Sequence, residues 1–264
     1  MDMKTIADYM LSLLPNGRYF FSKEEAISTL RLNKNQFLLQ ISRLKKKGSI
    51  KNLVRGFYMI VPPEYSHFGS LPPDWIVDPL MKYLHRDYYI GLLSAASLYG
   101  ATQQQPMTFQ VITDKQLRPI KLERGGIEFH YYKDCSLATK KEISTPTGYA
   151  KISSKEQTIV DLVRFHTVCG FLSNVAHIIR DLGESCNSEA LRSVVESEKM
   201  NTVLQRLGYI LELLGFLEFA IVVEQELRSR QVYETLLRPD FHIKQGKRIH
   251  RWKLILNDTL EIDE

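Results

Sequence analysis

Apolar residues near the amino end of the chain repeat at the spacing of short amphipathic helices. Residues 6–14 place Ile, Met and Leu side chains on one helical face, and the Pro-Asn-Gly sequence at residues 15–17 ends this first helix. Ser22 followed by Glu25 predicts a capping box that opens a second helix, which runs to about Leu30. Two short helices are therefore expected before residue 31.

A third helix is expected to begin at its N-cap Asn33 and to end at Gly48. One arc of this helix is predicted to face the core and holds Phe37, Leu38, Ile41 and Leu44. The other side carries polar and basic side chains, namely Asn35, Gln36, Gln40, Arg43, Lys46 and Lys47. The helix is therefore expected to present a cationic, amide-bearing surface.

The next segment, residues 49–61, is rich in β-branched and aromatic residues on both sides of Gly56, which predicts a β-hairpin. Three short helices followed by a basic hairpin are typical of a winged helix-turn-helix. Proline and glycine are frequent in residues 62–74, which we expect to be a linker. The predicted domains are therefore a winged helix-turn-helix at residues 1–61 and a larger domain at residues 75–264.

The larger domain is expected to have the α+β fold class. Helical patterns occupy residues 75–86, 90–99, 154–165, 171–182, 188–198, 203–214 and 216–228. Strand patterns occupy residues 108–113, 118–122, 127–132, 149–152 and 248–256, and residues 124–126 are typical of a hairpin turn. Strands and helices form separate blocks instead of alternating, which favours an α+β fold over a doubly wound sheet. The carboxyl-terminal half of this domain is expected to be helical.

Positive charge is concentrated in the amino-terminal part of the chain. Residues 1–61 hold eleven Lys and Arg against four Asp and Glu, a net charge of +7, whereas the remaining residues hold 24 basic and 26 acidic side chains. A basic module joined to a nearly neutral body is typical of a nucleic-acid-binding protein, because neutralised phosphates release counterions. A solvated lysine-rich face is the simpler alternative.

The second helix of a helix-turn-helix lies in the major groove of duplex DNA, and its first turns reach the base edges. Amide side chains suit adenine, and arginine suits guanine or a phosphate. Leu39 suits a thymine methyl group, or packs against the second helix. The predicted DNA-contacting residues are Lys34, Asn35, Gln36, Leu39, Gln40, Arg43, Lys46, Lys47, Lys51 and Arg55. A winged helix used only for protein contacts is the alternative interpretation.

The cysteines indicate a reducing compartment. Cys135, Cys169 and Cys186 are odd in number and form no Cys-x-x-Cys pair. The first residues lack the order of a signal peptide, and no uninterrupted apolar stretch is long enough to span a membrane. A cytoplasmic location is therefore expected.

Three sets of residues are candidates for enzyme sites: His166 with Cys169, Gly69 and Ser70 with Asp74 and Asp78, and Glu123 with Glu128 and Lys133. The first has no second ligand pair for a metal. The second lacks the Asp-x-Asp pair of a nucleotidyltransferase, and the third has no characteristic spacing. We therefore expect no catalytic activity, metal or cofactor.

The chain resembles the AbiEi family of bacterial antitoxins. The resemblance lies in residues 55–58 (Arg-Gly-Phe-Tyr), 91–100, 154–162 and 206–215, taken in that order. None of these segments is a catalytic signature, and small residues such as Gly208 and Gly215 are expected to permit close helix approach.

The resemblance implies a repressor of its own type IV toxin–antitoxin operon. Such a protein would bind inverted repeats in double-stranded DNA, as a homodimer or as two monomers that meet on DNA. Its carboxyl-terminal domain would antagonise a nucleotidyltransferase-like toxin without a stable complex. The alternatives are a ligand-responsive regulator, with a site near residues 130–132, and a DNA-processing enzyme.

Overall fold

The computed structural model describes residues 5–102, 106–123 and 125–261. The chain divides into two compact units. Unit 1 comprises Met1–Tyr88, Met107–Lys133 and Glu142–Lys151, and unit 2 comprises Tyr89–Pro106, Asp134–Lys141 and Ile152–Glu264. Over the described ranges, no helix is both long enough and apolar enough to cross a membrane.

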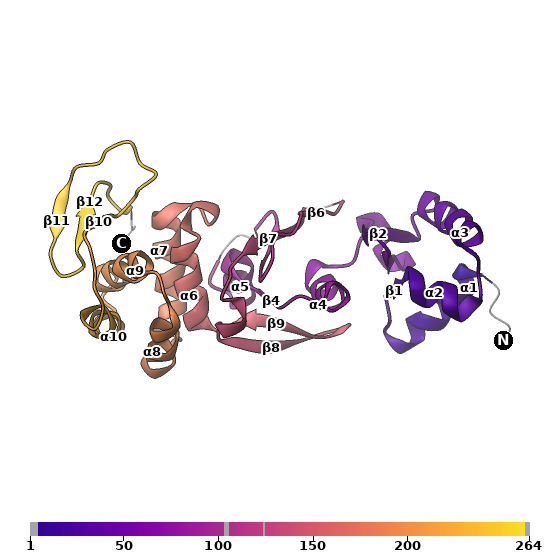
Figure 1. The fold of residues 1–264 in the computed structure, drawn as a ribbon, viewed down its shortest axis with the longest axis horizontal. Helices are drawn as coiled ribbons and strands as arrows, with labels where there is room; N and C mark the ends of the chain where they lie inside the picture. The colour runs from indigo at the N-terminus through magenta and orange to yellow at the C-terminus, as the bar shows by residue number, and fades with distance from the viewer. Residues whose placement is uncertain (1–4, 103–105, 124, 262–264) are drawn as a thin grey trace. The chain divides into compact units, whose positions relative to one another are not determined.

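The first part of unit 1, residues 5–61, is called the amino-terminal segment below (indigo in Figure 1). It contains the helices α1 (Ile6–Leu13), α2 (Lys23–Leu30) and α3 (Lys34–Lys46) and the strands β1 (Phe20–Ser22), β2 (Ile50–Val54) and β3 (Phe57–Ile60). The strands form an antiparallel sheet in the order β1-β3-β2. This order of elements is compatible with the predicted winged helix-turn-helix, although β1 was not predicted.

The helix boundaries follow from the capping residues. The Ser22 hydroxyl accepts the Glu25 N–H at 3.0 Å, and the Glu25 carboxylate accepts the Ser22 N–H, so the predicted capping box is confirmed. Gly17 and Gly48 adopt left-handed conformations after α1 and α3, with φ of 66° and 69°. Gly56 has a φ of 82° in the turn between β2 and β3, as the hairpin prediction required.

Two apolar clusters hold unit 1 together. The first lies under α1, α2 and α3 and contains the fully buried Ile6 and Phe37. The second contains Phe57 and Leu53 of the hairpin together with Leu80 of α4 (Pro73–Leu84) and Val111 of β5 (Phe109–Thr113). The predicted linker, residues 62–74, lies within unit 1 and includes a 3-10 helix at Pro63–Phe68.

The largest sheet has six strands in the order β6-β7-β5-β4-β9-β8. Its other strands are β4 (Tyr88–Ile90), β6 (Ile120–Lys121), β7 (Gly126–Tyr131), β8 (Lys140–Thr145) and β9 (Gly148–Ser153). Strand β5 pairs in parallel with β7, whereas β6 pairs antiparallel with β7 and confirms the predicted hairpin. One residue of the predicted hairpin turn, Arg124, lies outside the described residues.

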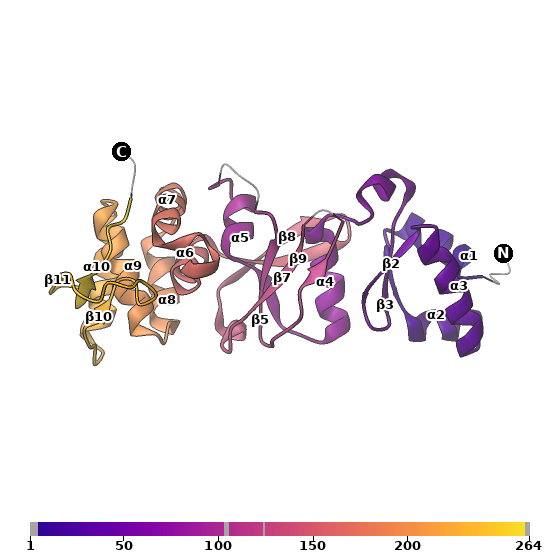
Figure 2. The same ribbon diagram turned by 90° about the horizontal axis from the view of Figure 1, so that it is seen from above.

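Unit 2 is mainly helical. Its helices are α5 (Leu92–Leu98), α6 (Lys155–Arg164), α7 (Phe171–Gly183), α8 (Ser188–Ser197), α9 (Asn201–Leu213) and α10 (Leu217–Arg228). A small sheet of β10 (Thr235–Leu236), β12 (Leu254–Leu256) and β11 (Lys247–Ile249) follows them. Figure 2 shows this sheet beside α9 and α10 near the carboxyl end. Helices and strands thus occupy separate blocks, and the α+β fold class is confirmed.

Several elements of the larger domain differ from the prediction. Strands β4, β8 and β10 were not predicted, and the single strand expected at residues 248–256 is wrong. A turn at residues 250–253 separates β11 from β12, and Lys253 adopts a φ of 47° there. The turn leaves Arg251 exposed and buries Trp252. This alternation of exposed and buried residues is the same as in a strand, so the sequence pattern could not reveal the turn.

Candidate nucleic-acid interface

Helix α3 begins at a capping box. The Asn33 side chain accepts the Gln36 N–H at 2.9 Å, and the Gln36 side chain accepts the Asn33 N–H at 2.9 Å. Phe37 and Ile41 are buried, and this anchors one face of α3 in the core of the amino-terminal segment. The opposite face is free to meet a partner.

Most predicted DNA-contacting residues are exposed. The exposed members are Lys34, Asn35, Gln36, Leu39, Arg43, Lys46, Lys47 and Arg55. Gln40 and Lys51 are half-buried. Leu38 was expected to face the core, but its side chain is 48% exposed, so that prediction is wrong. The apolar arc is narrower than predicted: Phe37 and Ile41 are buried and Leu44 is partly buried against the same core, whereas Leu38 lies outside it.

Two of the predicted base-reading amides have structural partners. Gln36 completes the capping box of its own helix. The Gln40 side-chain carbonyl accepts a hydrogen bond of 2.8 Å from the backbone N–H of Ile6, the first residue of α1. A residue whose carbonyl oxygen already accepts a hydrogen bond cannot use that oxygen to read a base without breaking the bond.

The remaining residues form a stripe along α3. Asn35, Leu39 and Arg43 are spaced by four residues, so they lie on one side of the helix, and all three are exposed. Ser42 was not singled out from the sequence, but it is also exposed and lies three residues after Leu39. An amide, an apolar side chain, a hydroxyl and a guanidinium together suit the edge of a major groove.

Basic side chains gather at the carboxyl end of α3. Lys45, Lys46 and Lys47 are exposed, and Lys47 is the C-cap residue. The Nζ atom of Lys45 lies 5.6 Å from the centre of the Tyr58 ring. Cations also stabilise the last turn of a helix, because its free carbonyl groups carry partial negative charge. These lysines can therefore stabilise α3 itself as well as bind phosphate.

The hairpin turn that carries Arg55 is fixed from one side. The Tyr83 hydroxyl of α4 donates to the carbonyl oxygen of Arg55 at 3.1 Å, and the Tyr83 ring stacks on Phe57 with ring centres 4.5 Å apart. Gly56 allows this approach, since a Cβ atom there would lie 2.7 Å from the Tyr83 hydroxyl oxygen. The Arg55 side chain stays exposed on a rigid support.

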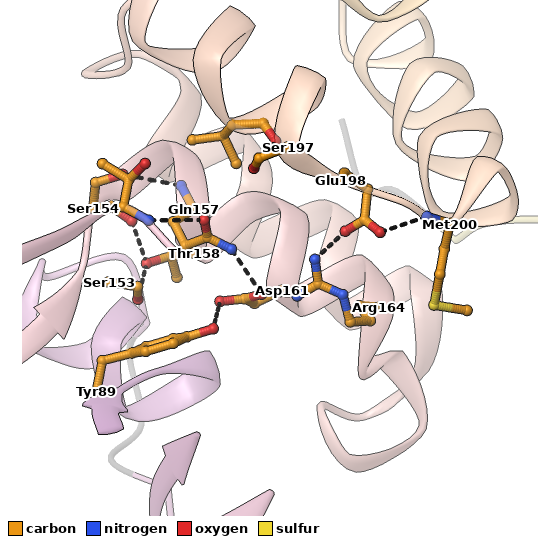
Figure 3. A network of polar contacts seen from close by, with 12 residues as sticks. Tyr89, Ser153, Ser154, Gln157, Thr158, Asp161, Arg164, Ser197, Glu198 and Met200 are labelled. Atoms are coloured by element: carbon orange, nitrogen blue, oxygen red, sulfur yellow. Dashed lines mark hydrogen bonds and ion pairs between the residues drawn. The ribbon is translucent and has the colours of Figure 1, made fainter. Parts of the chain in front are cut away.

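A second polar cluster lies inside unit 2 (Figure 3). Asp161 is fully buried and accepts hydrogen bonds from the Tyr89 hydroxyl at 2.9 Å and the Gln157 amide at 3.0 Å. Arg164 forms ion pairs with both Asp161 and Glu198, and Glu198 accepts the Met200 N–H at 2.7 Å.

This buried network is suited to joining helices. Burial raises the pKa of Asp161 and holds the pKa of the Tyr89 hydroxyl well above its usual value. Arg164 and Asp161 lie on α6, whereas Glu198 follows α8 directly, so the network connects these elements. With the Asp161 and Glu198 side chains almost entirely shielded from solvent, a substrate cannot reach them. We interpret this part of the resembling motif as structural.

The residues weighed as enzyme sites do not assemble a metal centre. Within the described ranges, no group of three or more His, Cys, Asp or Glu side chains is placed to hold a metal ion. Burial raises the pKa of the Cys169 thiol to about 12, which disfavours the thiolate that a metal requires. Glu123 pairs with Lys51, and the Glu128 carboxylate lies 3.9 Å from His130.

A cavity of about 170 Å³ lies between the end of α10 and the turn at residues 250–253. Its charged lining consists of Glu224, Arg228, Arg230, Arg251 and Lys253. Three of the four cations have carboxylate partners, since Glu224 pairs with Arg228 and Arg251 and Glu226 pairs with Arg230. The Lys253 ammonium donates to the carbonyl oxygen of Val232. The lining thus carries four cations and one carboxylate, and it does not include residues 130–132, where a ligand-responsive regulator was expected to have its site.

The two glycines of the last resembling segment have different roles from those predicted. A Cβ atom on Gly208 would lie 2.1 Å from the ring of Trp252, so this glycine admits an indole and not a neighbouring helix. A Cβ atom on Gly215 would have no neighbour within 4 Å. Glycine is favoured at this position because its φ of 82° lies in the left-handed region.

Comparison with known proteins gives a family match over part of the chain and an extended structural match. Residues 89–213 match the family model described as the AbiEi antitoxin C-terminal domain. The RV2827C protein from Mycobacterium tuberculosis matches with a TM-score of 0.66 and 16% identity, over 94% of this chain and 90% of that one. This similarity shows a shared fold.

A shorter match is to an antigenic nucleotidyltransferase-like protein from Paracoccidioides brasiliensis, with a TM-score of 0.36 and 13% identity over 56% of this chain and 91% of that one. No curated protein matches the chain.

Proposed function

We propose that the chain is the antitoxin of a type IV toxin–antitoxin system, because residues 89–213 match the AbiEi antitoxin C-terminal domain. This match confirms the resemblance seen in the sequence. We further propose that the amino-terminal segment binds operator DNA and represses the operon of the chain itself. In this proposal residues 1–61 bind DNA, and residues 62–74 link them to residues 75–264, which counter the toxin without catalysis. The protein acts in the cytoplasm.

The observation that carries DNA binding is the exposed stripe of Asn35, Leu39 and Arg43 on α3. These side chains project from a helix whose opposite face is buried, so the backbone that carries them is held in place before DNA binds. Preorganised donors lose less conformational entropy on binding than mobile ones. Lys34 supports the proposal, because a cation at the first turn of a helix is disfavoured by the helix dipole and gains from a nearby phosphate.

The proposed division of labour follows from this geometry. Asn35 and Arg43 read base edges, and Leu39 meets a thymine methyl group. Lys34, Lys46, Lys47 and Arg55 contact phosphates and set the register on the duplex. Gln36 and Gln40 hold the reading helix in shape. Two copies of the chain would occupy the two halves of an inverted repeat, since a two-fold site matches a two-fold protein arrangement.

The proposal is tested by fluorescence anisotropy with a labelled duplex from the promoter of the chain's own operon, competed with random duplex. We expect specific DNA to compete better than random DNA by tenfold or more. The substitution Arg43→Ala should reduce the specific affinity by about tenfold, because a bidentate guanine contact contributes about 1–3 kcal/mol. Arg192→Ala on α8 removes an equal charge from unit 2 and should leave the affinity unchanged. Equal competition by random duplex would refute operator recognition.

Antitoxin activity is tested separately by growth. The neighbouring reading frame should stop growth when expressed alone, and growth should return when the chain is co-expressed. An Arg43→Ala chain should still restore growth when both genes are driven by foreign promoters, since neutralisation is assigned to residues 75–264. A neighbour that is harmless alone would contradict the antitoxin role.

A further inference from the structure

Lys51, a predicted phosphate contact of the hairpin, already has an anionic partner within unit 1. Its Nζ atom lies 3.4 Å from Oε1 of Glu123, which follows β6. The Lys51 side chain is 23% exposed and the Glu123 side chain is 67% exposed. The pair therefore sits at the surface, where a duplex could reach the lysine and would also meet the carboxylate.

The position of Glu123 is shaped by its surroundings. A Cβ atom on Gly69 would lie 2.4 Å from Cγ of Glu123, so the glutamate lies directly across the backbone of this glycine. Leu53 of β2 and Leu122, the neighbour of Glu123, belong to the same apolar cluster. This shared core holds the β6–β7 hairpin next to the hairpin that carries Lys51.

We infer that Glu123 competes with a DNA phosphate for Lys51, so that the β6–β7 hairpin borders the DNA-contacting surface and limits its affinity. This inference rests on the DNA binding proposed above. One ammonium group that bridges to a carboxylate gains less from a phosphate, and the carboxylate itself repels the phosphate. DNA binding through Lys51 therefore requires Glu123 to move away.

The size of the effect follows from ordinary surface electrostatics. Freeing Lys51 from an exposed ion pair should strengthen DNA binding by about 1.4- to fivefold at 0.1 M salt. A phosphate contact added to the complex makes the slope of log affinity against log salt steeper by about 0.9. Both quantities are measurable in the anisotropy experiment.

The test is a double-mutant cycle of Glu123→Gln and Lys51→Ala, measured with operator duplex from 0.05 to 0.3 M salt. Glu123→Gln alone should raise the affinity and steepen the salt slope. In the Lys51→Ala background the same change should have no effect beyond that of Glu142→Gln, a control that removes another exposed carboxylate from unit 1.

Two outcomes would overturn the inference: no gain from Glu123→Gln, or an equal gain with and without Lys51. The parent chain distinguishes these from failure of the proposed function. If it binds operator and loses affinity through Arg43→Ala, DNA binding stands whatever Glu123 does. If it binds no duplex at low salt, the proposed function fails before Glu123 is tested.

Discussion

The side chain of Gln40 holds the start of α1, because its Oε1 atom accepts a hydrogen bond of 2.8 Å from the backbone N–H of Ile6. The first N–H groups of a helix have no partner within the helix, and here the neighbouring helix supplies one. Gln40 thus connects α3 to α1. The amide side chains of α3 therefore divide into Gln36 and Gln40, which hold the fold, and Asn35, which is proposed to read DNA.

This division predicts different results for two amide substitutions on the same helix. Gln40→Ala should lower the free energy of unfolding by about 1 kcal/mol, the usual cost of losing a helix-capping hydrogen bond. Asn35→Ala should leave the free energy of unfolding within about 0.5 kcal/mol of the parent. Urea unfolding followed by circular dichroism measures both.

The same two substitutions should affect DNA recognition in the opposite order, with the larger effect from Asn35→Ala. Asn35→Ala should reduce discrimination at one base pair of the operator by about 1–3 kcal/mol, measured with duplexes altered at single positions. Gln40→Ala should keep the sequence preference. If Gln40→Ala abolished discrimination at one base pair while stability stayed unchanged, the capping role assigned to Gln40 would be wrong.

The network in Figure 3 predicts a large effect from one side chain. Arg164→Met removes the cation between Asp161 and Glu198 and leaves two buried carboxylates without a positive charge to balance them. Breaking a buried ion pair in this way costs about 3–5 kcal/mol. Tyr89→Phe serves as a milder companion, because it removes only one hydrogen bond to Asp161 and should cost about 1.5–3 kcal/mol.

The pH dependence gives the Arg164 prediction an independent check. Without the guanidinium, the folded-state pKa of Asp161 should rise further above its unfolded value, because burial raises this pKa and the cation that lowers it is gone. The folded state then takes up protons first, so the stability difference between Arg164→Met and the parent should narrow as pH falls from 8 to 5. A difference that is absent, or that widens over this range, would refute the proposed role of Arg164.

Local signals explain why much of unit 1 could be predicted from the sequence. Ser22 and Asn33 are capping residues, and Gly56 marks a hairpin turn; each depends on backbone chemistry within four residues, so the sequence is sufficient. Strand β8 has no such signal, since its side chains are half-buried or exposed and Ile143 is its single apolar residue. Its pairing comes from the rest of the sheet, which a local pattern does not contain.

The candidate site was predictable only in part for the same reason. The exposed positions of Asn35 and Arg43 follow from the helical period, which the sequence reveals. The partners of Gln40 and Lys51 lie 34 and 72 residues away along the chain, so no spacing rule could assign them. Those two long-range contacts change the roles of the residues without changing their positions on the elements.

A buried histidine predicts that stability depends on pH. Burial lowers the pKa of His166, and Arg206 and Arg238 lower it further, although Asp240 lies 3.9 Å away and opposes the shift. The folded state therefore favours the neutral ring, whereas the unfolded state binds a proton below about pH 6.5. Because the unfolded state then holds more protons, stability should be complete above about pH 6.5 and should fall as the pH is lowered below it.

The contribution of His166 can be separated by comparing two histidine substitutions. His166→Gln should reduce the loss of stability between pH 7.5 and 5.5, measured as the shift in urea midpoint. His130 keeps part of the loss, since burial lowers its pKa as well. His67→Gln changes an exposed ring and should retain the full loss. If His166→Gln and His67→Gln behaved alike, burial of His166 in the folded chain would be in doubt.

The contact between Gly208 and Trp252 predicts a strong effect of a single methyl group. Trp252 is held at two points, because its indole Nε1–H donates to Glu212 and its backbone carbonyl oxygen accepts from the Gln205 amide at 3.0 Å. It cannot retreat from an added Cβ atom, so Gly208→Ala should cost about 1–3 kcal/mol by overpacking. In a Trp252→Leu background the space exists, and the same change should cost at least 1 kcal/mol less. Urea unfolding of the four chains measures this coupling, and additive losses would show that Gly208 is not there to admit the Trp252 ring.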